Sequence, residues 1–133
     1  MMPNARKKIL VVDDSATSLM MVRRILNNRP YDVVTAQDGE EAVRRAITDR
    51  PDLILMDVVM PKLNGFEACQ RIRQNEHTRA IPIILVTTRG EAKSVEVGFN
   101  CGCNDYVTKP VNSLELLSKL SSFLGSGAEA VRT

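Results

Sequence analysis

The sequence contains one histidine, three cysteines and little net charge, and each of these scarcities argues against a class of protein. An odd number of cysteines without framework spacing disfavours a disulfide-stabilised secreted domain. The motif Cys101–Cys103 has no second cysteine pair, and His77 is the only histidine, so a closed four-ligand zinc site is also disfavoured. We expect structural or incidental cysteines, with Cys69 a small core residue.

Long apolar runs are also absent. No stretch approaches the roughly 20 apolar residues of a membrane-spanning helix, and no apolar segment of a signal peptide follows the basic Met1–Lys8. The net charge of +2 is too small to indicate nucleic-acid binding, and the arginines are spaced as on solvated helix faces. We therefore expect a cytoplasmic protein without direct contact to a membrane or nucleic acid.

What the sequence does contain is a regular alternation of short apolar runs and amphipathic segments. Its composition, 44% hydrophobic and 26% charged over 133 residues, is ordinary for one soluble domain. The predicted strands are Ile9–Val12, Tyr31–Ala36, Leu53–Asp57, Ile83–Val86 and Asp105–Thr108. The predicted helices are Ala16–Asn28, Glu40–Thr48, Phe66–Gln74, Glu91–Phe99 and Leu114–Leu124. This order predicts an α/β fold with a parallel sheet and helices on both faces.

Local signals refine the helices. Ser15 is placed to cap the first of them. Apolar residues at helical spacing predict the buried faces, and these include Met20, Ile47 and Leu114.

Polar side chains stand at the carboxyl ends of the predicted strands. Asp13 and Asp14 follow the first strand, Asp57 ends the third, and Thr87 and Lys109 follow the fourth and the last. Ligands of open parallel sheets bind at this edge, so these groups should gather in one small space. Two carboxylates ~4 Å apart repel by about 4 kcal/mol at intermediate dielectric. Lys109 and a divalent cation would offset that repulsion.

The chemistry of this set points to phosphoryl transfer. Oxygen ligands without imidazole or thiolate suit Mg²⁺, and a carboxylate, a hard cation, a lysine and a hydroxyl around one point can move a phosphoryl group. Each residue also has a structural explanation. Asp13 and Asp14 could cap a helix, Asp57 could begin a turn, and Thr87 and Lys109 could be ordinary strand-end and loop residues. Four coincidences at four strand ends are less plausible than one site.

Five motifs carry a resemblance to a known family: Ile9–Ser15, Leu53–Pro61, Asn64–Gly65, Ile83–Thr87 and Asp105–Pro110. In this order and spacing they resemble the response-regulator receiver domain of bacterial two-component systems, in particular the chemotaxis regulators. The resemblance covers about residues 7–124, and leaves 1–6 and 125–133 as flexible termini or linker. It implies a flavodoxin-like (βα)5 sheet with strand order 2-1-3-4-5.

The resemblance also implies roles for individual residues. Asp57 would be the phosphoacceptor, and Asp13, Asp14 and Asp57 would bind Mg²⁺ together with the carbonyl of Val59. The side chain of Val59 and that of Arg89 would tune hydrolysis of the phosphoryl group. Because an apolar Val59 cannot orient a water molecule, we predict slow self-dephosphorylation.

Further implied roles concern the switch. Thr87 would supply the hydroxyl group of the switch, and Lys109 would contact the phosphoryl group. The rotamer of Tyr106 would be coupled to the position of Thr87. Pro110 would follow a cis peptide bond, at the modest cost of an X-Pro bond. The face formed by the fourth helix, the last strand and the last helix would then change shape on phosphorylation.

The expected partners are a histidine kinase or phosphotransfer protein, which supplies the phosphoryl group, and a downstream target protein or an attached effector; a homodimer is a further option. The resemblance implies no enzyme beyond self-phosphorylation and autodephosphorylation. One alternative is a receiver-like scaffold that is never phosphorylated. Another is a phosphohydrolase of the haloacid dehalogenase type, which needs an acid where Val59 stands. The complete set of site residues favours the phosphorylatable receiver.

Overall fold

The computed structural model describes residues 6–88 and 101–125, so the predicted helix Glu91–Phe99 lies outside the described residues. The described strands form one parallel sheet in the order β2-β1-β3-β4-β5, which confirms the predicted fold and topology. The strands are β1 Lys7–Val12, β2 Tyr31–Ala36, β3 Leu53–Asp57, β4 Ile83–Thr87 and β5 Asp105–Thr108. The described helices are α1 Ala16–Leu26, α2 Gly39–Asp49, α3 Gly65–Gln74 and α5 Ser113–Leu124.

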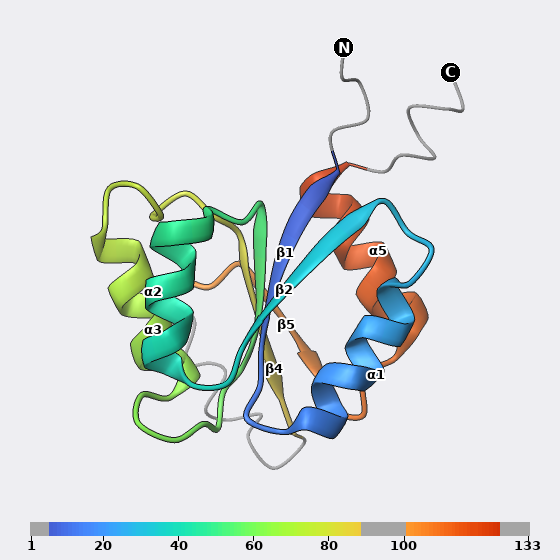
Figure 1. Cartoon of the computed structure of the whole chain (residues 1–133), viewed down its shortest axis with the longest axis horizontal. Coiled ribbons are helices and arrows are strands. Elements are labelled where there is room, and N and C mark those ends of the chain that lie inside the picture. The colour runs from blue at the N-terminus through green and yellow to red at the C-terminus, as the bar shows by residue number, and fades with distance from the viewer. Residues whose placement is uncertain (1–5, 89–100, 126–133) are drawn as a thin grey trace.

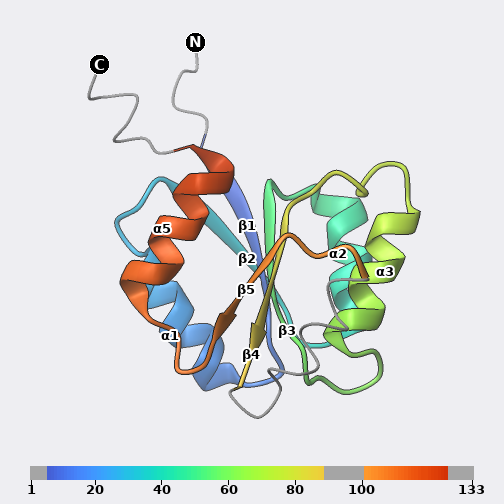
Figure 2. The same ribbon diagram turned by 180° about the vertical axis from the view of Figure 1, so that it is seen from behind.

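Helices cover both faces of the sheet. Helices α1 and α5 lie side by side on one face, and α2 and α3 lie on the other (Figures 1 and 2). Successive residues of β1 point to opposite faces, as in any strand. Ile9 and Val11 therefore pack in the core cluster under α1 and α5, whereas Leu10 and Val12 belong to the cluster under α2 and α3. This burial on both faces explains why Ile9–Val12 of β1 and Leu53–Met56 of β3 are uninterrupted apolar runs.

Each described helix begins at a short polar residue. The side chains of Ser15, Asp38, Asn64 and Asn112 accept a hydrogen bond from the main-chain N–H three residues further on. Such caps each stabilise a helix by about 1 kcal/mol. The predicted cap at Ser15 is confirmed. No helix within residues 6–88 and 101–125 is both long and apolar enough to cross a membrane.

Three predicted core positions are wrong. Met20, Ile47 and Leu114 are 58%, 38% and 78% exposed. Each lies one or two positions away from a helix residue that does face the sheet, and one position along a helix rotates a side chain by about 100°. On α5 the buried positions are Leu116 and Leu120.

The first helix is also shorter than predicted. It ends at Leu26 rather than at Asn28, because Asn27 adopts an extended conformation and Asn28 has a φ of 64°. Asparagine tolerates this left-handed region better than most residues.

Candidate functional site

Three carboxylates meet at the carboxyl edge of the sheet. Asp13 directly follows β1 and Asp57 is the last residue of β3. These strands are neighbours, with Val12 paired to Met56, so the topology brings Asp13 and Asp57 together. One carboxylate oxygen from each of Asp13, Asp14 and Asp57 lies within 4.8 Å of the others. Asp13 and Asp57 are buried, and Asp14 is exposed.

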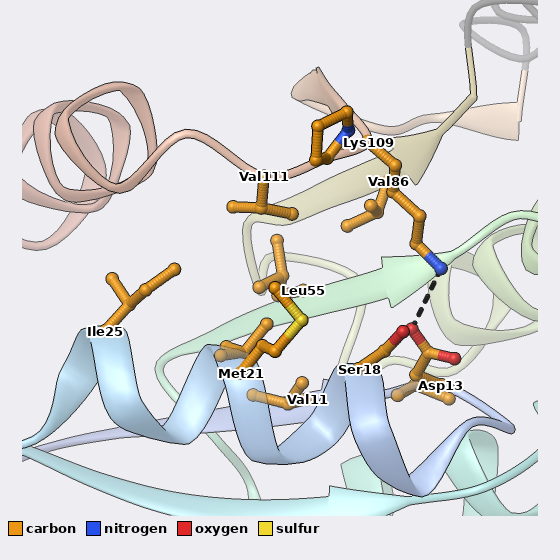
Figure 3. Close-up of a pocket in the computed structure, with 12 residues that line it drawn as sticks. Val11, Asp13, Ser18, Met21, Ile25, Leu55, Val86, Lys109 and Val111 are labelled. Carbon is orange, nitrogen blue, oxygen red and sulfur yellow. Dashed lines mark hydrogen bonds and ion pairs between the residues drawn. The ribbon is translucent and has the colours of Figure 1, made fainter.

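Lys109 supplies a positive charge to this cluster. Its Nζ donates hydrogen bonds to Oδ2 of Asp13 and to Oδ2 of Asp57, both at 3.1 Å. Figure 3 shows the lysine side chain extending from the segment after β5 toward Asp13. One ammonium group thus bridges two carboxylates from strands β1 and β3.

The protonation equilibria reflect burial and charge. Burial raises the pKa of Asp57, Lys109 opposes the rise, and the charges of Asp13 and Asp14 add to it. Burial disfavours the charged form of Lys109, but hydrogen bonds to Asp13 and Asp57 outweigh this effect and raise its pKa. The lysine therefore stays charged at neutral pH.

The donor set fits a hard divalent cation. Three carboxylates around one ammonium leave an excess of negative charge in a partly desolvated space. All of the clustered ligand atoms are carboxylate oxygens, which Mg²⁺ prefers. Asp13, Asp14 and Asp57 could therefore hold Mg²⁺.

The loop after β3 is held tightly against the end of that strand. Gly65 donates its N–H to the carbonyl of Val58 at 2.8 Å, and a Cβ at Gly65 would collide with the main-chain oxygen of Asp57. Only glycine permits this approach. Val59 lies in this loop with a side chain that is 61% exposed, so water can reach its surroundings.

The residues expected to form the switch lie on, or directly after, the two strands beyond β3. Thr87 is fully buried, and its hydroxyl donates to the carbonyl of Thr88 at 3.2 Å. The main-chain N–H of Lys109 donates to the carbonyl of Thr87 at 2.6 Å. This hydrogen bond joins the residue that follows β5 to the end of β4. Tyr106 is 37% exposed and pairs in register with Leu85.

Pro110 and Arg89 were also predicted to belong to the site. The peptide bond between Lys109 and Pro110 is cis, the isomer that the resemblance implied. Arg89 lies outside the described residues.

The sequence analysis missed an apolar cavity beside the charged cluster. It has a volume of about 120 Å³ and lies between α1 and the segment that follows β5 (Figure 3). Its lining is mostly apolar and includes Met21, Ile25 and Val111, with Asp13 and Lys109 at one end. The sequence signal was the spacing of Met21 and Ile25, four residues apart on one face of α1.

The chain matches known proteins over most of its length. The family model of the response regulator receiver domain matches residues 9–121. The chain is 41% identical over 118 residues to the alkaline phosphatase synthesis transcriptional regulatory protein PhoP of Bacillus subtilis, covering 89% of this chain but 48% of PhoP. It is 38% identical over 117 residues to PilH of Pseudomonas aeruginosa, covering 88% of this chain and 97% of PilH. The chain thus spans about half the length of PhoP and nearly all of PilH.

Solved structures show the same fold. A putative response regulator from Chloroflexus aurantiacus superposes with a TM-score of 0.86 at 33% identity, covering 90% of this chain and 98% of that one. The receiver domain of the sensor histidine kinase PA1611 from Pseudomonas aeruginosa, which has a magnesium ion coordinated in its active-site cleft, gives a TM-score of 0.84 at 36% identity, covering 92% and 100%. The chemotaxis protein CheY4 of Vibrio cholerae gives 0.83 at 36%, covering 90% and 100%. The chain belongs to the response regulator receiver domain family, and is a receiver domain of two-component signalling.

Proposed function

We propose that this receiver domain is a phosphoacceptor switch in which Asp57 takes a phosphoryl group from a histidine kinase or phosphotransfer protein. The observation that carries the proposal is the contact of a buried carboxylate at a strand end with Lys109 at 3.1 Å, beside two further carboxylates. A structural ion pair would need only one carboxylate. The surplus of negative charge calls for a divalent cation, and that cation together with Lys109 would attract the oxygens of an incoming phosphoryl group.

Each residue of the site would have a separate role in the transfer. A carboxylate oxygen of Asp57 forms a bond to phosphorus while the bond from phosphorus to the donor nitrogen breaks. Asp13, Asp14, Asp57 and the carbonyl of Val59 would hold Mg²⁺, which when bound neutralises charge on the phosphoryl oxygens. Lys109 opposes the rise in the pKa of Asp57 that burial causes, and it would then contact a phosphoryl oxygen.

The response follows from the groups that the new dianion attracts. A phosphoryl group on Asp57 attracts the ammonium of Lys109 and the hydroxyl of Thr87. Movement of Thr87 on β4 would open space for Tyr106 on the neighbouring β5, and the face that contains β5 and α5 would change shape. This face would contact a downstream protein, an attached effector or a second copy of the chain. The proposed domain spans residues 7–124 of a cytoplasmic protein, without direct binding to nucleic acid or membrane.

The test is the intact mass of the chain after incubation with a small-molecule phosphodonor and Mg²⁺. We expect one added phosphoryl group on the wild type, none on Asp57→Asn, and none when a chelator is present. The matched control is Asp52→Asn, which changes an aspartate at the opposite end of β3 and should be phosphorylated normally. Phosphorylation of Asp57→Asn to the wild-type extent would refute the assignment.

A wild type without added mass needs a second measurement, because rapid hydrolysis also removes the phosphoryl group. Titration with beryllofluoride, followed by NMR, separates the cases. Chemical-shift changes at Thr87 and Tyr106 would support a switch that responds to phosphorylation. Their absence would indicate a scaffold that is never phosphorylated. Steady release of inorganic phosphate from many substrates would instead indicate a phosphohydrolase.

A further inference from the structure

The three cysteines of the chain, which the proposed function does not use, lie together in the structure. Cys69 is on α3, whereas Cys101 and Cys103 precede β5. All three are reduced and buried in the core cluster on the α2 and α3 side of the sheet. The thiol of Cys69 donates to the carbonyl of Cys101 at 3.4 Å, although 32 residues separate the two. The fold thus gathers thiols that the sequence places apart.

Cys101 is the central thiol of this group. The neighbouring thiols of Cys103 and Cys69 lower its pKa, with a smaller contribution from the positive charge of Arg73. The same contacts, together with burial, raise the pKa of Cys103 and of Cys69. A lowered pKa is one of the two conditions for a reactive cysteine, and access to the sulfur is the other.

The turn that carries these thiols lies at the surface. Gly102, between the two cysteines, is exposed, and Cys103 keeps 9% of its surface exposed. The side chain of Arg73 lies over this turn: its Nε donates to the carbonyl of Gly102 at 2.8 Å, and a Cβ at Gly102 would lie 2.9 Å from Cγ of Arg73. A single long side chain is a modest barrier, so a molecule as small as hydrogen peroxide can reach Cys101 through local motion.

We propose that Cys101 and Cys69 form a reversible disulfide when the protein meets hydrogen peroxide. Two observations favour this pair. The Cys69 thiol contacts the main chain of Cys101 directly, and the glycine after Cys101 gives this short segment the freedom to adjust to the bond. The inference is independent of the proposed phosphoacceptor function.

The chemistry is a two-electron oxidation of the thiol pair. The Cys101 thiolate attacks one oxygen of the peroxide, the O–O bond breaks, and Cys101 becomes a sulfenic acid with release of hydroxide. The sulfur of Cys69 then attacks the sulfur of Cys101, its proton and the sulfenic hydroxyl group leave as water, and the S–S bond forms. The two cysteines together lose two electrons, and peroxide is reduced to water.

The disulfide would join two separate parts of the fold. Cys69 lies in the middle of α3, and Cys101 lies four residues before β5, which carries Tyr106 of the proposed switch. The cross-link would therefore hold the entry to β5 against α3.

The experiment treats the reduced full chain with a small excess of hydrogen peroxide and follows its intact mass. We expect the monomer to lose the mass of two hydrogen atoms and to regain it with dithiothreitol. Peptide mapping without reductant should identify a cross-link between Cys69 and Cys101. An unchanged mass, an overoxidised cysteine without a cross-link, or a disulfide between two chains would each overturn the proposal.

Single variants test the pairing. Cys69→Ala and Cys101→Ala should show no decrease in mass after peroxide treatment. Cys103→Ala, the matched control in the same turn, should still lose the mass of two hydrogen atoms. A cross-link that persists in Cys69→Ala and disappears in Cys103→Ala would overturn the pairing in favour of the two cysteines around Gly102. Thermal melts establish that each variant is folded, and the wild-type peptide map decides the pairing if one is not.

Discussion

The ammonium nitrogen of Lys109 lies 3.1 Å from Oδ2 of Asp57, and the two residues are 52 positions apart in the chain. The same nitrogen contacts Asp13 at 3.1 Å, so the lysine occupies the position where a cation would be attracted. The ammonium group and a divalent ion therefore compete for the same carboxylate charge.

Removal of this ammonium should tighten Mg²⁺ binding. In Lys109→Met the carboxylates lose their positive neighbour, and we expect the dissociation constant for Mg²⁺ to fall about tenfold, or about 1.4 kcal/mol. Phosphorylation of Asp57 should be slower in the same variant. Calorimetric titration with Mg²⁺ measures the first effect. The control is Lys119→Met, which removes a lysine paired with Asp105 at 2.9 Å; equal Mg²⁺ affinity in Lys109→Met and this control would contradict the prediction.

The burial of Asp57 should make stability depend on pH. Its pKa is raised by burial, against the effect of Lys109. Folding therefore favours the protonated carboxyl, whose stabilising contribution is complete below the unfolded pKa of about 3.9 and is lost as pH rises through the folded pKa. Asp57→Asn should consequently raise the free energy of unfolding at neutral pH by about 1 kcal/mol, because an amide carries no charge to desolvate.

This gain should shrink as pH falls toward the ordinary carboxyl range, where the wild-type side chain also becomes neutral. Urea unfolding of both proteins without Mg²⁺, at neutral and at acidic pH, measures the difference. A gain of the same size at both pH values would show that charge is not its cause.

The exposed Val59 should make the phosphorylated state long-lived. Val59 is 61% exposed in the loop after β3, and its isopropyl group cannot orient water by hydrogen bonds. Val59→Asn should shorten the lifetime of the phosphoryl group about tenfold, because an amide can hold a water molecule by hydrogen bonds. Loss of the phosphorylated mass with time measures the rate. Leu114→Asn, on the exposed side of α5, should leave it unchanged. A wild-type lifetime of seconds that Val59→Asn does not alter would disprove this explanation.

Arg73 should contribute strongly to stability. Its guanidinium donates to the carbonyl of Gly102 at 2.8 Å, the carbonyl of Ile81 at 2.7 Å and the side chain of Asn104 at 2.8 Å. We expect Arg73→Ala to lower the free energy of unfolding by about 2 kcal/mol, since these acceptors lose a charged donor. Urea denaturation measures the loss. The control Arg71→Ala, exposed on the same helix, should change stability by less than about 0.5 kcal/mol. Similar losses in both variants would contradict this role.

The strands were predicted more accurately than the helix faces, and the reason is physical. Strand β3 is bounded by prolines and buried on both sides, so a local run of apolar residues is sufficient to identify it. The orientation of a helix depends on the surface it covers. Leu114 and Leu116 are equally hydrophobic, but the packing of α5 on the sheet buries only Leu116.

The site shows the same division. Asp13, Asp57 and Lys109 could be grouped from sequence because parallel strands end at one edge of the sheet. Arg73 could not be connected to Gly102 and Asn104 in this way, since 29 and 31 residues separate them and none ends a strand of the sheet at that edge. Contacts of that kind arise only from tertiary packing.

The distance along the chain between Asp13 and Lys109 has a consequence for synthesis. They are 96 residues apart, and the strand that precedes Lys109 is the last of the described strands and forms an edge of the sheet. A nascent chain grows from its amino terminus, so its aspartates leave the ribosome well before the lysine does. A chain that stalls or is cut before this edge strand has the carboxylates without their ammonium group. Unfinished copies therefore lack the ammonium contact on which the proposed switch depends.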